Sequence, residues 1–374
     1  MKRLIVCADG TWNSRDDASE SGEGLTNVAR LARLIAPVDA QGVRQEHVYL
    51  TGVGVERSAL KRWLGGATGW GLSDNVLEAY AWLIERFEPH DELYLFGFSR
   101  GAFTARSLAG LIRNSGLLRR EHVGRLREAY ELYRDRAPAT HPSAQRSVDF
   151  RAAYAHETPI HVLGVWDTVG SLGVPTSGPV GWYTRHRYGF HDVALSSRVR
   201  NAFHALAIDE HRKPFAPTLW EVQEAERVRA GQRVEQVWFA GAHCDVGGGY
   251  AECGLSDGAL AWMIARAAEC GLAFRDRCEA ELRADCHGPV HDSMSAMYRV
   301  FGRHLRPIAE RRLTTAGPVE TYESVSPSVL ERMRRATDYA PENLKRYLAS
   351  VGAGAGGAGG AHVAQTGVPV PPPA

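Results

Sequence analysis

Residues 91–106 read DELYLFGFSRGAFTAR. Residues 92–98 have the length and the aliphatic and aromatic content of a buried strand, and the small residues after Gly101 are typical of a helix start. Between them lies a G-x-S-x-G turn, in which Gly97 and Gly101 flank Ser99. Such a turn holds its serine in a strained backbone conformation, and side chains at the two glycine positions would collide with the neighbouring strand and helix. The stretch therefore predicts a nucleophile elbow that presents Ser99 at a strand end.

Other apolar runs surround this elbow along the chain. Those with the character of buried strands are residues 4–7, 47–51, 160–167 and 234–240. Those with helical periodicity between the strands are residues 75–87, 102–113, 123–133 and 258–268. Because strands alternate with helices, we expect an α/β fold with a mostly parallel sheet and helices on both faces. In such sheets the functional groups gather at the carboxyl ends of the strands.

A serine hydroxyl needs a base that takes its proton and a carboxylate that orients this base. Of the fifteen histidines, only His243 directly follows an apolar strand, within a glycine-containing loop. Asp167 ends another predicted strand and is expected to orient His243. Asp245 is the rival acid, but two residues from the histidine it is better suited to fixing the loop. The chain order Ser99, Asp167, His243 is the one expected of α/β-hydrolases and predicts a serine hydrolase.

The oxyanion formed during ester cleavage needs backbone N–H donors. The amide of Arg100 at the start of the helix after the elbow is one candidate, and Gly10 or Thr11 after the first strand is the second. The same loop, CADGT at 7–11, is similar to the D-x-D-G-T loop of haloacid-dehalogenase-type phosphatases. Its first aspartate position holds Cys7, which removes the phosphoryl acceptor and one magnesium ligand. A metal-dependent phosphatase is therefore the less favoured alternative.

The overall composition gives no sign of a specialised partner. Lys and Arg number 44 against 43 Asp and Glu, for a formal charge of +1, so we expect no nucleic-acid partner. The six cysteines lack the paired spacing of a zinc site, and we expect most of them to be reduced thiols and expect neither a metal nor another cofactor. We recognise no cleavable signal peptide and no run of about eighteen apolar residues that would predict a transmembrane segment. The default prediction is a cytoplasmic protein, with signal-less secretion and peripheral membrane contact left open.

For the domain organisation we expect a single α/β-hydrolase domain over residues 1–350. Residues 351–374 are rich in Gly, Ala and Pro and predict a disordered tail. Residues 171–232, between the acid and the base, are a candidate cap or lid whose aromatic side chains could admit an acyl chain or form a satellite core.

Two groups of charged residues have a functional and a structural interpretation. Residues 275–350 are expected to be a helical part, and their arginines could attract an anionic head group but more commonly form a solvated helix face. These arginines are Arg299, Arg303, Arg306, Arg311 and Arg312. The second group is His204, Asp209, Glu210 and His211. It could suggest a metal or acid–base site, but we expect a helix that spreads these side chains over its surface.

Five motifs together are similar to those of a known family. They are DGTWN at 9–13, GFSRGA at 97–102, WDTV at 166–169, HRKPF at 211–215 and GAHCDVGGGY at 241–250. Through them, over most of residues 1–265, the chain resembles the bacterial and fungal α/β-hydrolase domains of largely uncharacterised function that include the type VI secretion phospholipase effectors.

The resemblance implies the triad Ser99, Asp167 and His243 and a carboxylic ester substrate, which in the effector branch is a glycerophospholipid. The resulting prediction is a serine ester hydrolase that acts on a small-molecule or lipid ester through an acyl-enzyme. The alternative is a catalytically silent binding or toxin-scaffold protein with the same fold.

Overall fold

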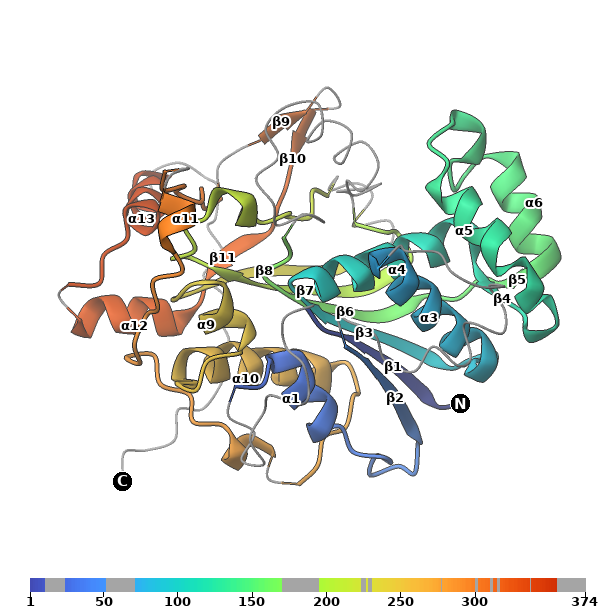
Figure 1. The fold of residues 1–374 in the computed structure, drawn as a ribbon, viewed down its shortest axis with the longest axis horizontal. Coiled ribbons are helices and arrows are strands. Elements are labelled where there is room, and N and C mark those ends of the chain that lie inside the picture. Colours follow the sequence, from blue (N-terminus) through green and yellow to red (C-terminus); the bar gives the residue numbers. More distant parts are fainter. Residues whose placement is uncertain are drawn as a thin grey trace.

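The computed structural model describes residues 1–10, 24–51, 71–169, 195–222, 227, 231–276, 278–299, 302–309, 312–314, 317–336 and 338–354. Through its centre runs a seven-stranded sheet of order β11-β8-β7-β6-β3-β1-β2, in which all neighbouring strands are parallel (Figure 1). The strands are β1 (Arg3–Ala8), β2 (Gln45–Leu50), β3 (Glu92–Phe98), β6 (Ile160–Trp166), β7 (Val199–Ala207), β8 (Arg233–Phe239) and β11 (Glu323–Val325). Parallel strands bring their carboxyl ends to one edge of the sheet, where loops and helix N-termini meet.

Helices cover both faces of the sheet (Figure 1). On one face lie α3 (Gly71–Arg86), α4 (Arg100–Ser115), α5 (Leu126–Arg134) and α6 (Gln145–Tyr154). On the other lie α1 (Asn27–Leu34), α9 (His243–Gly247) and α10 (Gly254–Glu269). The C-terminal helices α12 (Pro327–Arg335) and α13 (Glu342–Gly354) pack at the β8 and β11 end. The shorter elements are β4 (Leu117–Leu118), β5 (Ala155–His156), α11 (Ala296–Arg299), β9 (Arg312–Thr314) and β10 (Gly317–Val319).

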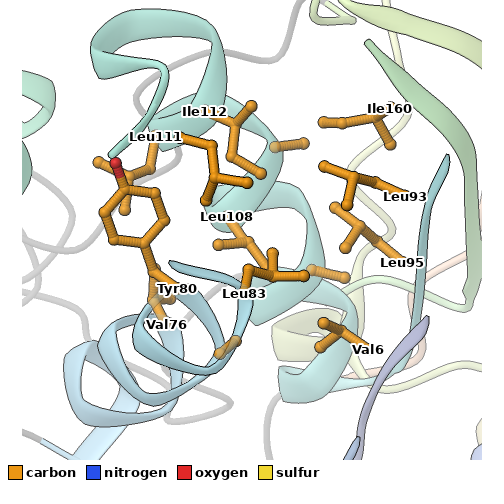
Figure 2. Close-up of a cluster of buried hydrophobic side chains, with 14 of the residues drawn as sticks. Val6, Val76, Tyr80, Leu83, Leu93, Leu95, Leu108, Leu111, Ile112 and Ile160 are labelled. Atoms are coloured by element: carbon orange, nitrogen blue, oxygen red, sulfur yellow. The ribbon is translucent and has the colours of Figure 1, made fainter. Parts of the chain in front are cut away.

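The central strands are buried on both faces, which explains their continuous apolar sequences. In β1, Leu4 and Val6 belong to the core under α3 and α4, whereas Ile5 and Cys7 belong to the core under α1 and α10. All four side chains are fully buried. Figure 2 shows the first of these cores, where side chains of α3 and α4 pack over the sheet. Burial of each Leu, Ile or Val contributes about 1.5–3 kcal/mol, which holds the strand ends in fixed places.

The five predicted strands are confirmed as β1, β2, β3, β6 and β8, and the four predicted helices as α3, α4, α5 and α10. The fold class, a parallel sheet with helices on both faces, is likewise confirmed. Of the helices in the described ranges, none has both the length and the apolar character that crossing a bilayer requires.

Three predicted boundaries need correction. The cap candidate 171–232 contains β7, a central strand of the sheet, while residues 170–194, 223–226 and 228–230 lie outside the described residues. The part 275–350 is not purely helical, because β11 within it pairs with β8. Helix α13 extends to Gly354, so the predicted tail begins no earlier than residue 355, and residues 355–374 lie outside the described part. In the first two cases long-range strand pairing overrides the local composition.

Candidate active site

Ser99 lies in the turn between β3 and α4, with φ 57° and ψ −118°, a conformation that L-residues rarely adopt. The two flanking glycines make this turn possible. A Cβ at Gly97 would overlap the carbonyl of Gly101, and a Cβ at Gly101 would overlap the carbonyl of Ala8 in β1. A strained serine of this kind costs about 1–3 kcal/mol and persists only where the surrounding structure enforces it. The side chain of Ser99 is thereby held at the carboxyl edge of the sheet, partly exposed.

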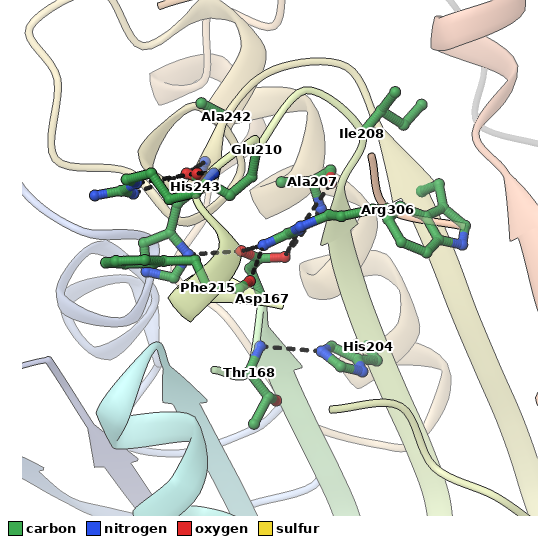
Figure 3. Close-up of polar contacts among 12 residues, drawn as sticks. Asp167, Thr168, His204, Ala207, Ile208, Glu210, Phe215, Ala242, His243 and Arg306 are labelled. Atoms are coloured by element: carbon green, nitrogen blue, oxygen red, sulfur yellow. Dashed lines mark hydrogen bonds and ion pairs between the residues drawn. The ribbon is translucent and has the colours of Figure 1, made fainter. Parts of the chain in front are cut away.

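Asp167 and His243 meet at the same edge (Figure 3). His243 is the first residue of α9, and its Nδ1 lies 2.6 Å from Oδ2 of Asp167, which directly follows β6. Both residues are buried. The amide of Ser99 donates a hydrogen bond of 3.2 Å to the carbonyl of Trp166, the residue before Asp167. The backbone therefore ties the serine turn to the carboxylate that contacts the histidine.

The imidazole of His243 packs on the residue before the serine. Its ring centroid lies 4.6 Å from that of Phe98, and Gly247 passes so close to the same ring that a Cβ there would overlap it. Among the described residues, no hydrogen bond joins Ser99 to His243, and none engages Nε2 of His243. In a site without substrate such contacts are often long. The geometry leaves Nε2 available to accept a proton while Nδ1 faces the carboxylate.

The carboxylate of Asp167 has further hydrogen-bond donors besides His243. The fully buried Arg306 donates from Nη1 to Oδ1 at 2.6 Å and from Nη2 to Oδ2 at 3.0 Å, and the amide of Ala207 donates to Oδ1 at 3.1 Å. Burial alone would raise the pKa of Asp167, but the charge of Arg306 and the contact with His243 lower it below its ordinary value. The carboxylate is therefore ionised throughout the neutral range.

Behind Asp167 lies His204 of β7, fully buried (Figure 3). Its Nε2 accepts a hydrogen bond of 3.1 Å from the amide of Thr168, and its Nδ1 lies 3.1 Å from Oε1 of Gln236. Burial and the nearby charge of Arg106 lower the pKa of His204 to about 3, so the ring is neutral and donates through Nδ1. It holds the backbone immediately after Asp167 in place.

The expectation that His204, Asp209, Glu210 and His211 lie around the surface of a helix is wrong. His204 lies in a central strand, and Glu210 in the following loop is fully buried. Local spacing resembles a helix surface there, but pairing with β6 and β8 makes Val199–Ala207 a strand, and the polar groups of His204 and Glu210 are buried in hydrogen bonds.

Glu210 supports the other side of the histidine. Its Oε2 accepts a hydrogen bond of 3.3 Å from the amide of His243, and both carboxylate oxygens pair with Arg212. Burial raises the pKa of Glu210, but Arg212 outweighs this and lowers it. The guanidinium of Arg212 lies 3.5 Å from the ring centre of Phe215, which packs edge-on against His243. The HRKPF motif therefore forms one wall around the imidazole.

Asp245, the rival acid, has other partners. Its Oδ2 accepts hydrogen bonds from the amides of Ala242 and His291, and its Oδ1 lies 2.6 Å from Nδ1 of His291. A Cβ at Gly241, where φ is 111°, would overlap the side chain of Asp245. Asp245 thus shapes the turn that carries His243, and its carboxylate is bonded to the imidazole of His291, not to that of His243.

The three predicted oxyanion donors differ in position and in whether their backbone amides are already hydrogen-bonded. Arg100 begins α4, and Gly10 lies against the serine, where a Cβ would be 3.4 Å from Cβ of Ser99. The amide of Gly10, however, donates to Oδ1 of Asp9 at 2.7 Å, so it is engaged in this structure. Thr11 lies outside the described residues.

The same loop counts against the phosphatase alternative. Both oxygens of the buried Asp9 have partners within the protein, since Oδ1 accepts from the amide of Gly10 and Oδ2 accepts from Thr26 and Tyr49. Cys7 belongs to the core under α1 and α10. All six cysteines lie in the described residues, and no disulfide joins any two of them. Within the described ranges, no three His, Cys, Asp or Glu side chains gather as a metal-binding group.

The residue that sequence reasoning missed is Arg306. Neither predicted role, an anionic head-group contact or a solvated helix face, applies, because the side chain is fully buried against Asp167. It lies 139 positions from its partner, and no local pattern marks it.

Comparisons with known proteins place the chain in a wider context. An uncharacterised protein of Saccharomyces cerevisiae is 30% identical over 234 residues, which cover 57% of this chain and 32% of that protein. The crystal structure of an uncharacterised protein from Pseudomonas aeruginosa is similar with TM-score 0.45 and 19% identity, covering 76% of this chain and 49% of that one. The structure of the Tle1 effector bound to the VgrG spike of the type 6 secretion system is similar with TM-score 0.35 and 19% identity, covering 66% and 51%. The chain thus spans at most about half the length of these relatives.

The parallel sheet, the strained serine turn after β3 and the helix that follows it are those of an α/β-hydrolase, which confirms the predicted fold. Residues 2–266 match the family described as the catalytic domain of Tle1-like phospholipase effectors of the type VI secretion system. This match covers well over half of the chain and includes all five sequence motifs. The chain belongs to the Tle1-like phospholipase effector catalytic-domain family.

Proposed function

We propose that this protein is a serine hydrolase that cleaves a carboxylic ester through an acyl-enzyme. Ser99 is the nucleophile, His243 is the general base and Asp167 is the carboxylate that orients the base. The observation that carries the proposal is the 2.6 Å contact between Nδ1 of His243 and Oδ2 of Asp167, at the strand edge that also holds the strained turn of Ser99.

The chemistry follows from the tautomer that this contact favours. With its Nδ1–H donating to Asp167, the imidazole keeps a lone pair on Nε2, which takes the proton of Ser99 as Oγ attacks the ester carbonyl. The same proton then passes to the departing alcohol, and Ser99 carries the acyl group. A water molecule, deprotonated by His243, attacks the acyl-enzyme and releases the acid and the free serine.

For the developing oxyanion we propose the amide of Arg100, at the N-terminus of α4, as one donor. Gly10 and Thr11 stay predictions for the second donor. Gly10 is close enough to Ser99, but its amide would have to exchange the carboxylate of Asp9 for the substrate oxygen.

We propose a lipid ester as the substrate class, with a glycerophospholipid as its first member to be tested. The support is the description of the family, whose members are phospholipase effectors. A small-molecule ester fits the same chemistry, and a panel of esters of increasing acyl length next to phospholipid vesicles separates the two.

The first test compares Ser99→Ala with the wild-type chain. Wild type should react with a fluorophosphonate probe and hydrolyse p-nitrophenyl esters, and Ser99→Ala should lose the label and reduce kcat by about 10⁴-fold or more. The matched control is Ser143→Ala. Ser143 is exposed and has its Oγ 2.7 Å from Nδ1 of His141, so it has a histidine partner but neither a strained turn nor a carboxylate behind it.

The outcome separates the two functions predicted from the sequence. Labelling that persists in Ser99→Ala, or that is lost in Ser143→Ala, would contradict the assignment of Ser99. A folded wild-type chain that neither labels nor turns over any ester or phospholipid would favour the catalytically silent binding or scaffold protein.

A further inference from the structure

Arg306 belongs to a part of the chain that the family match does not include. The match ends at residue 266, whereas Arg306 lies in the segment 302–309 between α11 and β9. Its side chain is nevertheless fully buried beside Asp167 (Figure 3). The candidate site is therefore completed by a residue from outside the matched catalytic region.

The guanidinium is fixed on both sides. Besides its two hydrogen bonds to Asp167, Nη1 donates to the carbonyl of Ala207 at 2.8 Å and Nη2 donates to the carbonyl of Phe215. The backbone of Arg306 is fixed in turn, because the side-chain amide of Asn343 in α13 donates to its carbonyl at 3.0 Å. Phe215, whose carbonyl is thus bound, packs its ring against His243. The arginine connects the carboxylate, the wall of the site and the C-terminal helix.

This arrangement has two consequences for the acid. Paired hydrogen bonds from one planar guanidinium fix the plane of the carboxylate, which a single donor or a point charge does not do. The positive charge also offsets the cost of holding an ionised carboxylate in a buried position. His243 therefore faces one half of an ion pair instead of an unpaired negative charge.

We propose that Arg306 is a positioning residue of the active site, which keeps Asp167 ionised and directs its Oδ2 toward Nδ1 of His243. This inference rests on the proposed function, and it extends the functional unit to the segment after residue 266. Arg306 has no exposed surface, so we expect it to act through Asp167 and not by touching the substrate. Its removal should lower kcat and leave KM nearly unchanged.

The pH dependence of activity reports this role. From the elements around it, Asp167 faces His243 and Arg306, with the neutral His204 behind it. His243 also faces Glu210, whose charge Arg212 balances. Removing the charge of Arg306 therefore raises the pKa of Asp167, because the buried carboxylate loses its charged partner. This change moves the acid limb of the kcat/KM profile to higher pH.

The experiment measures kcat/KM against pH for p-nitrophenyl butyrate with the full chain and its variants. For Arg306→Met we expect a loss of kcat of about tenfold or more and an acid limb shifted upward by about one pH unit or more. Arg306→Lys keeps the charge but not the paired hydrogen bonds, so we expect reduced kcat with the limb near its wild-type position. If the methionine variant does not fold, Arg306→Gln removes the charge while keeping an amide donor, and the same upward shift is expected.

The matched control is Arg332→Met in α12. Arg332 is also buried in the C-terminal part, but it donates to the carbonyls of Cys286 and Gly288. The Arg332→Met variant should have a lower melting temperature and an unchanged acid limb of the kcat/KM profile. If the wild type is active and the acid limb is unchanged in Arg306→Met or Arg306→Gln, the inference about Arg306 is overturned and the proposed function is not. A wild type that is inactive and unlabelled overturns the proposed function, and the inference with it.

Discussion

Two aspartate–histidine pairs each include one residue of the segment after β8, His243 in one pair and Asp245 in the other, and the two pairs look alike by distance. Nδ1 of His243 is 2.6 Å from Asp167, and Nδ1 of His291 is 2.6 Å from Asp245. Their second ring nitrogens differ. Nε2 of His291 lies 3.5 Å from Glu252, and its ring stacks on Tyr250 with centroids 3.9 Å apart, whereas no described residue bonds Nε2 of His243.

The difference teaches that a short acid–histidine contact does not identify a catalytic base. His291 has carboxylates on both nitrogens and so stabilises a loop. His243 has a carboxylate on one nitrogen only, and it lies over the residue next to the strained serine. A general base needs a ring nitrogen that is not already engaged, and among the described residues His243 leaves its Nε2 unengaged whereas His291 does not, which supports the role that we propose for His243.

The largest expected effect separates the two histidines. His243→Ala should lower kcat for ester hydrolysis by about 10⁴-fold or more, because in the mechanism that we propose His243 takes the proton of Ser99. His291→Ala should leave kcat within about tenfold, because it alters only the support of the loop. Steady-state kinetics on both variants checks this. Because Ser99 and His243 act as one unit, the double variant should lose little more than either single variant, and additive losses would contradict the assignment.

The second-largest expected effect separates Asp167 from Asp245. Asp167→Asn should lower kcat by about 10³–10⁴-fold, since an amide does not favour the tautomer with Nδ1–H. Asp245→Asn should instead lower the free energy of unfolding by about 1–3 kcal/mol, because the amides of Ala242 and His291 would meet an NH₂ group or a weaker acceptor. Kinetics and urea unfolding on both variants give the comparison. A larger kinetic loss in Asp245→Asn would reverse our choice of acid.

The smallest effect concerns the histidine behind Asp167. The folded pKa of His204 is about 3, below the ordinary value of 6.5, so the unfolded chain binds a proton there first as the pH falls. Stability from this group is therefore present above pH 6.5 and is lost between pH 6.5 and about 3, by about 1.4 kcal/mol per pH unit.

His204→Gln keeps an acceptor for Thr168 and removes the titration. Urea unfolding at several pH values should show a shallower loss of stability than in wild type, by about 1 kcal/mol per pH unit. The exposed His141→Gln is the control and should leave the slope unchanged. Equal slopes in wild type and His204→Gln would show that the buried ring does not control acid stability.

The predictable parts of the fold are those that neighbouring residues determine. The runs that became β1, β3 and β6 are apolar because both faces are buried, and this is visible in a short window of sequence. Strand β7 escaped recognition because Arg200, Asn201 and His204 interrupt its apolar character. Its polar members are either at the exposed end or hydrogen-bonded to other strands, as His204 is to Gln236. Such pairing is invisible in the segment itself.

In the candidate site, too, the features that adjacent residues determine could be predicted, and those that depend on long-range contacts could not. The turn at Ser99 could be predicted because Gly97 and Gly101 encode a backbone conformation within five consecutive residues. The choice of Asp167 over Asp245 could be argued from strand ends but depends on which imidazole each carboxylate reaches. The sequence did not reveal that Arg306 is the partner of Asp167, because no periodic pattern links the two residues. They meet only because α13 packs beside the end of β7, where Asn343 binds the carbonyls of Ile208 and Arg306. Backbone conformation is written in adjacent residues, whereas the partner of a buried charge is selected by the whole fold.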